Sequence, residues 1–417
     1  MIPKLAHRTR IVATALIATA ALGLTACTGT EIAGPQGDAN SVDESLASGI
    51  DDAIAQAMSL SGSSQAVVGV WSGEQAYVRG YGDGEINGSA RIRGAQATQP
   101  VMCALLLDLV DQGRIDLDRK VSKDLPRQSG IEDVTYRQLC DMRSGIADYK
   151  QNYTSIFANN PTRPWPDQEL IAQGLAHSPL SWPGLDMHQS DTNAVLLGRA
   201  LEVNTGEELP ELLAEHVYSK AGMSASYYPS MSSTTIEGTT LTGHNFPVQG
   251  GKLVCDAGPV ETPEVSPSML SGAGATVTTV TDLKNFYESY LGGTFGGEAA
   301  SVVTETIPAK NPKRDDAGTP TEEPDTEGRQ WGFDVEKLGP LYGRSGAITG
   351  TLTAAYHDPD SGYTVVVALN NSAAGAAFAK ALAFQLAAIS SEAGSGPELP
   401  WSAEDQAAAL QKGAVCQ

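Results

Sequence analysis

Residues 341–371 read LYGRSGAITGTLTAAYHDPDSGYTVVVALNN and hold the pattern that decides the fold. Two runs within them, 350–357 and 363–369, are rich in Thr, Val, Ala and Tyr, which fit the pleated surface of a sheet. The five residues between these runs, DPDSG, have the composition of a turn. A further strand-like run covers 331–336, and the Ala-rich run 373–391 predicts a helix. This end of the chain therefore supplies strands and then a helix.

The first part of the chain repeats this combination of elements. Runs 65–71 (QAVVGVW) and 76–82 (AYVRGYG) predict a hairpin, and residues 43–60 carry apolar side chains at helical spacing. A second helix is predicted over 98–112. Residues 134–292 mix helical periods with long loops. We therefore predict an α/β (α+β) architecture, in which both chain ends build one sheet and a helical lobe is inserted between them.

The composition excludes several classes of function. The 417 residues include 27 Lys and Arg against 49 Asp and Glu, for a formal net charge of −22, and 41% of them are hydrophobic. The apolar content excludes a wholly disordered chain. Nucleic-acid binders neutralise phosphates with Lys and Arg, so the excess of acid predicts no nucleic-acid partner. The absence of a C-x-x-C pair and of a phosphate-binding glycine motif predicts no structural metal and no cofactor.

The beginning of the chain has the composition of an export signal. Three basic residues precede an apolar run over 11–24, which is too short to span a bilayer comfortably. Leu24-Thr25-Ala26-Cys27 follows and resembles a bacterial lipobox, in which the cysteine is acylated. We expect a signal peptide over 1–26, a lipid anchor at Cys27 and a tether over 27–42. An ordinary secretory signal with a chance cysteine is the alternative.

Loss of this signal would change the charge and the location of the chain. Because residues 1–26 carry three basic residues and no acid, the formal charge falls from −22 to −25. Such a chain is expected to be extracytoplasmic and held at the cell membrane by lipid rather than by basic residues. Outside the cytoplasm the other four cysteines either form two disulfides in one of three connectivities or stay buried as free thiols. They are Cys103, Cys140, Cys255 and Cys416.

Several stretches together carry a resemblance to a known family. They are 109–126 (LVDQGRIDLDRKVSKDLP), 134–149 (VTYRQLCDMRSGIADY), 183–206 (PGLDMHQSDTNAVLLGRALEVNTG) and 341–371. With them the chain resembles the family of serine β-lactamases, class C-like, and D-alanyl-D-alanine carboxypeptidases, which are penicillin-binding-protein-like. The resemblance implies an antiparallel sheet flanked by helices plus an all-helical lobe, with the active-site cleft between them.

The resemblance also sets the expected boundaries. The β-lactamase-related domain would cover 43–391, with a sheet lobe from 43–110 and 330–391. The helical lobe would cover about 111–329. Residues 392–417 are small and polar and are expected to form a poorly ordered C-terminal tail.

Three motifs carry the chemistry of that family, and each one is substituted here. The family places S-x-x-K at a helix start, Tyr-x-Asn on the helical lobe and His/Lys-x-Gly on a strand, and backbone N–H groups form its oxyanion hole. The ungapped register assigns these positions as follows: Gln96 and Gln99 for S-x-x-K, Gln189 and Asp191 for Tyr-x-Asn, Arg344 and Gly346 for His-x-Gly, and the N–H groups of Gln96 and Ala347 for the oxyanion hole.

These substitutions predict that the fold is kept and the reaction is lost. A carboxamide is neither a nucleophile nor a base at neutral pH. We therefore expect a pseudoenzyme that binds a peptidoglycan peptide or an extracytoplasmic protein. Arg344 is a candidate cation for a peptide carboxylate, unless it pairs with Asp191 and closes the cleft. The alternatives are an active serine hydrolase that uses Ser190 or Ser345, and a scaffold with a closed cleft.

Overall fold

The computed structural model describes residues 37–417 apart from 316–318, 324 and 326. The expected signal peptide, the anchor at Cys27 and most of the expected tether lie outside the described residues. The end of that tether forms an edge strand, β1 (Ala39–Asn40), which pairs with β3 (Gln75–Gly82).

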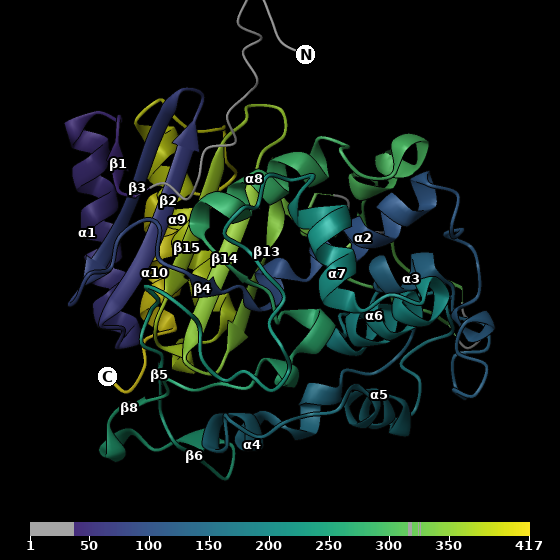
Figure 1. The fold of residues 1–417 in the computed structure, drawn as a ribbon. Coiled ribbons are helices and arrows are strands. Elements are labelled where there is room, and N and C mark those ends of the chain that lie inside the picture. The colour runs from purple at the N-terminus through teal and green to yellow at the C-terminus, as the bar shows by residue number, and fades with distance from the viewer. Residues whose placement is uncertain (1–36, 316–318, 324, 326) are drawn as a thin grey trace, which may run out of the picture. The chain divides into compact units, whose positions relative to one another are not determined.

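One antiparallel sheet of nine strands combines both ends of the described chain, as the sequence predicted (Figure 1). Its order is β1-β3-β2-β15-β14-β13-β12-β11-β10, and the hairpin β2–β3 joins the C-terminal strands where Val68 of β2 pairs with Val367 of β15. The strands are β1 (Ala39–Asn40), β2 (Gln65–Ser72), β3 (Gln75–Gly82), β10 (Ile307–Pro308), β11 (Gln330–Trp331), β12 (Glu336–Leu338), β13 (Leu341–Ile348), β14 (Thr351–His357) and β15 (Thr364–Leu369).

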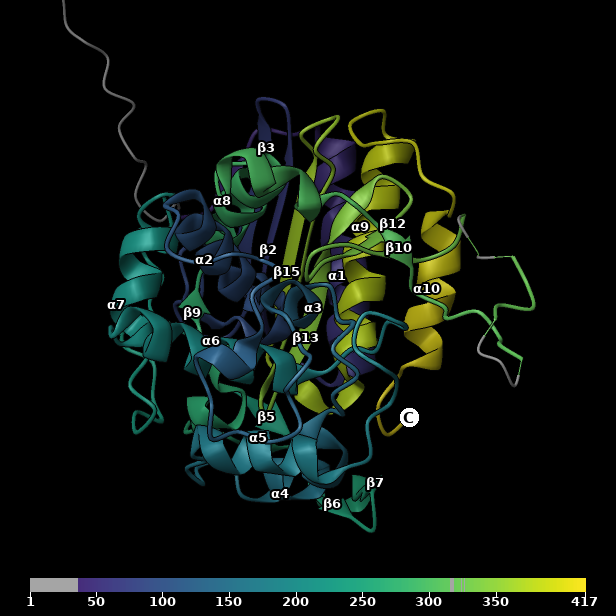
Figure 2. The ribbon, with the colours of Figure 1, turned by 90° about the vertical axis from the view of Figure 1, so that its right-hand side faces the viewer.

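Helices cover both faces of this sheet (Figure 2). Helices α1 (Glu44–Ser61), α9 (Ala376–Glu392) and α10 (Ala403–Lys412) share one apolar core with one face. The other face packs against α8 (Val280–Leu291) and the larger core that continues into α2 (Pro100–Asp111). Because both faces are covered, β14 and β15 are buried along their whole length; β15 is apolar from Val365 to Leu369, whereas β14 also buries Thr351, Thr353 and His357.

The middle of the chain forms the helical part and several short strand pairs. Helix α8 comes from the stretch expected in the helical lobe, yet it packs on β14 and β15. The helices before it are α3 (Tyr136–Cys140), α4 (Thr154–Asn159), α5 (Asp167–Ala176), α6 (Asp191–Thr205) and α7 (Leu209–Leu213). The short pairs are β4 (Ile92–Arg93) with β9 (Val277–Thr278), β5 (His244–Asn245) with β8 (Val260–Glu261), and β6 (Val248–Gln249) with β7 (Lys252–Leu253). None of the helices in the described ranges combines the length and apolarity that a bilayer span needs.

The expected lobe boundaries were wrong in part, because β10, from the stretch expected in the helical lobe, belongs to the central sheet. Two further expectations from the sequence were also wrong. The C-terminal segment is not poorly ordered: it forms α10, which packs on α9 through the fully buried Leu410. The strand expected over 331–336 is split between β11 and β12, because Asp334 adopts a left-handed backbone conformation with φ 58°. Cys103 pairs with Cys140 and Cys255 with Cys416, which selects one of the three connectivities.

Candidate functional site

The site forms where the edge of β13 is left open. Strand β12 pairs with β13 only as far as Gly343, so the rest of that edge faces the 3₁₀ turn Ala95–Thr98. A Cβ at Gly346 would lie 2.2 Å from the backbone nitrogen of Gln96, so this close approach requires glycine. Ala95 bends the chain ahead of Gln96 with a positive φ of 46°, a strained conformation that tends to occur at functional sites.

The side chain of Gln96 occupies the open edge of β13. Its carbonyl oxygen Oε1 accepts a hydrogen bond from the Ala347 backbone N–H at 2.9 Å. Its amide nitrogen Nε2 donates to Asp191 Oδ2 at 2.6 Å. Only 4% of Gln96 is exposed. The Ala347 N–H is therefore already satisfied by the Gln96 carboxamide.

Asp191 connects Gln96 to a lysine that sequence reasoning missed. Asp191 begins α6 and is buried, and Lys150 Nζ lies 2.7 Å from its Oδ2 and 3.9 Å from Asp148 Oδ2. Burial lowers the pKa of Lys150, but the carboxylates of Asp191 and Asp148 outweigh this and raise the pKa above its ordinary value. Burial, together with the charge of Asp191, raises the pKa of Asp148 to about 6. The two carboxylates thus keep Lys150 mostly in the ammonium form, which cannot act as a general base.

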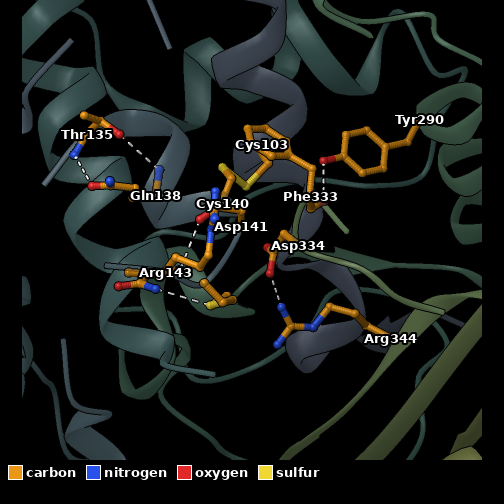
Figure 3. Close-up of a disulfide and its surroundings, with 12 residues drawn as sticks. Cys103, Thr135, Gln138, Cys140, Asp141, Arg143, Tyr290, Phe333, Asp334 and Arg344 are labelled. Carbon is orange, nitrogen blue, oxygen red and sulfur yellow. Dashed lines mark hydrogen bonds and ion pairs between the residues drawn. A yellow bond between two sulfur atoms is a disulfide. The ribbon is translucent and has the colours of Figure 1, made fainter. Parts of the chain in front are cut away.

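Arg344 is held in the core beneath the site and is not a free cation. Its guanidinium pairs with Asp334, and not with Asp191, and lies over the Trp331 ring at 5.0 Å from the centroid. The Asp334 backbone N–H donates to the carbonyl of Cys140 at 2.7 Å, next to the disulfide with Cys103 (Figure 3). Burial raises the pKa of Asp334 although Arg344 opposes this effect. Asp334 thus links the disulfide-bonded Cys140 to Arg344, which is the first residue of the third motif.

The comparisons with known proteins agree with this fold. The Beta-lactamase family model matches residues 50–388. This chain belongs to the beta-lactamase family. It is 28% identical to a D-aminopeptidase from Cereibacter sphaeroides (strain ATCC 17029 / ATH 2.4.9) over 71% of this chain and 53% of that protein. The chain therefore spans about half the length of this curated relative.

Solved structures of the same fold include amide hydrolases and a penicillin-binding-protein homologue. A D-stereospecific amidohydrolase from Streptomyces sp. has a TM-score of 0.65 and 23% identity, covering 78% of this chain and 94% of that one. A D-amino acid amidase from Ochrobactrum anthropi SV3 has a TM-score of 0.63 and 19% identity, covering 79% and 91%. The octameric penicillin-binding protein homologue from Pyrococcus abyssi has a TM-score of 0.65 and 19% identity, covering 86% and 80%.

The remaining motif positions of this beta-lactamase family member are not brought together. Gln99 is fully buried, and its side-chain amide nitrogen and oxygen have no hydrogen-bond partner among the described residues. Gln189 is exposed on the loop before α6. Helix α2 begins at Pro100 rather than at Gln96, because proline suits the first turn of a helix, where its missing N–H costs no hydrogen bond. Of the candidate residues, the structure thus joins Gln96, Asp191, Gly346 and Ala347.

Proposed function

We propose that this chain is a lipid-anchored, catalytically silent member of the beta-lactamase family that acts by binding rather than by acyl transfer. The observation that carries the proposal is the Gln96 carboxamide, whose oxygen already accepts the Ala347 N–H. In the family's serine-hydrolase chemistry a backbone donor at this place stabilises the negative charge that develops on the substrate oxygen. Here that donor is occupied by the residue that replaces the nucleophile.

The charge state of the site supports the same proposal. Gln96 has no group to form an acyl intermediate, and Lys150 is held as an ammonium ion by two carboxylates. Because the members of a catalytic set act as a unit, restoring one of them would recover little rate. A Gln96→Ser chain is therefore expected to remain inactive while Gln99 and Gln189 stay in place.

A displaced nucleophile has little support in the contacts of the two candidate serines. Ser345 lies opposite Ala354 across the strand pair, and Ala354 belongs to the core that the sheet shares with α1 and α9. Because directly opposed residues share a face, the Ser345 side chain is on the face of the sheet that those helices cover. The Ser190 hydroxyl is buried and has no hydrogen-bond partner within the described part of the chain, so no base is in place to activate it.

The contacts of Arg344 bear on the ligand. Because it pairs with Asp334, Arg344 is not free to bind the carboxylate of a wall peptide. A peptide carbonyl would also have to displace Gln96 Oε1 from Ala347. Both contacts favour an extracytoplasmic protein partner over a peptidoglycan peptide. Calorimetry with a D-Ala-D-Ala peptide tests this choice: we expect no heat of binding, and saturable binding would favour the peptide.

Turnover assays test the proposed loss of catalysis. We expect the purified chain to hydrolyse neither nitrocefin nor a D-amino acid amide above the buffer rate. The Ser190→Ala and Ser345→Ala chains are the controls for a displaced nucleophile. Turnover by the unaltered chain that disappears in either control would overturn the proposal and assign the reaction to that serine.

A further inference from the structure

One carboxylate oxygen brings an amine and a carboxamide together at the base of the site. Asp191 Oδ2 accepts from Lys150 Nζ at 2.7 Å and from Gln96 Nε2 at 2.6 Å. Because both nitrogens contact the same oxygen atom, the distance between them cannot exceed the sum of the two contact distances. We propose that Lys150 and Gln96 join in an intramolecular isopeptide bond, with Gln96 as the acyl donor and the Lys150 amine as the nucleophile.

The reaction balances with the groups that the site holds. Asp191 accepts a proton from Lys150, and the neutral Nζ attacks Cδ of Gln96 to form the new C–N bond. The Ala347 N–H, which already bonds Oε1, stabilises the negative charge on that oxygen. Asp191 passes its proton to Nε2, the Cδ–Nε2 bond breaks, and ammonia leaves. The new amide nitrogen releases its surplus proton, so the products are one amide and one ammonium ion.

The surroundings favour attack by the lysine over attack by water. Gln96 and Asp191 are buried, which keeps water from the Cδ atom, and the amine is held by the same carboxylate oxygen as the Gln96 amide, so it competes as an intramolecular nucleophile. The Lys150 side chain is 32% exposed, so ammonia has a way out to solvent. Asp148 and Asp191 keep most of the amine protonated, and we therefore expect a slow, single reaction rather than a rapid one.

The same chain contains a similar trio that serves as an internal control. Lys220 Nζ lies 2.6 Å from Asp108 Oδ1, while Gln112 Nε2 donates at 2.8 Å to the other oxygen, Oδ2. Within the described residues the Gln112 carbonyl oxygen accepts no hydrogen bond, so it has no counterpart of the Ala347 donor. The three residue types are therefore the same, but the lysine and the glutamine contact different oxygens of the aspartate, and no N–H group in the described part of the chain donates to the glutamine oxygen. We expect no bond between Lys220 and Gln112.

Tandem mass spectrometry of the full chain, aged at neutral pH, reduced, alkylated and digested with trypsin, tests the proposal. We expect a linked pair of peptides joined at Lys150 and Gln96, about 17 Da lighter than the two together because ammonia is lost. Trypsin would no longer cut after Lys150. The Lys150→Arg chain keeps the cation and removes the reactive amine, and Gln96→Met keeps the length of the side chain and removes the acyl group. Neither should show the pair.

Two outcomes would overturn the proposal. One is an aged chain that yields only separate, unmodified peptides for Gln96 and Lys150. The other is a linked pair of Lys220 and Gln112 at a similar yield, which would show that closeness alone is sufficient. The readout is the mass of the chain without substrate, so it is independent of whether the proposed catalytic silence holds.

Discussion

Gln96 makes both of its side-chain contacts with groups that sequence reasoning had already placed at the site, Asp191 and the backbone of Ala347. The resemblance predicts these positions because the surrounding stretches match the family without gaps. The sequence did not identify Lys150 as a site residue, because Lys150 follows directly after the family-like stretch 134–149 and belongs to none of the three motifs. Only the fold brings its amine to Asp191.

Asp148 gives the site a pH dependence that a single substitution tests. The pKa of Asp148 is raised from 3.8 to about 6, so the folded chain holds this proton through a range in which the unfolded chain has lost it. Stability should therefore fall as the pH rises from about 4 to about 6. Asp148→Asn keeps the backbone cap on Lys150 N–H and removes the titration. We expect denaturant titrations to show a flatter pH profile, by about 1–3 kcal/mol across this range.

An identical profile in the Asp148→Asn chain would contradict this assignment. Asp118→Asn is the matched control, because the Asp118 side chain is 76% exposed and makes only a surface ion pair with Arg137. Its effect on the same profile should be small.

Among the elements, the strands of the central sheet were predicted most closely. The predicted runs 65–71, 350–357 and 363–369 agree within about one residue with β2, β14 and β15, because β-branched and aromatic residues between turn residues favour strands. The run 331–336 (WGFDVE) misled because its apolar residues alternate as in a strand, yet the left-handed Asp334 interrupts it. Tertiary contacts explain this interruption: the Asp334 side chain pairs with Arg344, and its backbone N–H donates to the Cys140 carbonyl.

Helix α10 shows how a polar composition conceals a packed element. Ser402 and Asp405 form a capping box at its start, and Leu410 is its buried residue. Leu410→Ala should lower the free energy of unfolding by about 2–4 kcal/mol, because it leaves a cavity against α9. Gln411→Ala, at an exposed position on the same helix, should change it by less than about 0.5 kcal/mol. Equal effects of the two substitutions in chemical denaturation would mean that α10 does not pack as described.

At the scale of the whole molecule, both chain ends build one sheet, and two disulfides link segments that lie outside the sheet. Cys255–Cys416 links residues that are 161 positions apart and fixes the end of the chain beside α10. The sequence predicted that both ends share the sheet, since strands occur at each end. It left the disulfide pairing open, because pairing depends on which cysteines the fold brings together.

The proposed lipid anchor is a further prediction at this scale. With Cys27 intact we expect the chain in the membrane fraction, released by detergent but not by a high-salt wash, because lipid rather than basic residues would hold it. Cys27→Ser should move the chain to the soluble fraction. Release of the unaltered chain by salt alone, or membrane retention of the Cys27→Ser chain, would contradict the anchor.

The central claim is that Gln96 occupies the site and that no other residue takes over acyl transfer. Its most direct test is the intact mass of the purified chain after prolonged incubation with an excess of a penicillin, with a catalytically active serine β-lactamase-fold enzyme as the positive control. We predict no penicilloyl adduct on this chain under conditions that label the control fully. A stoichiometric adduct, mapped to any residue of the site, would contradict the claim.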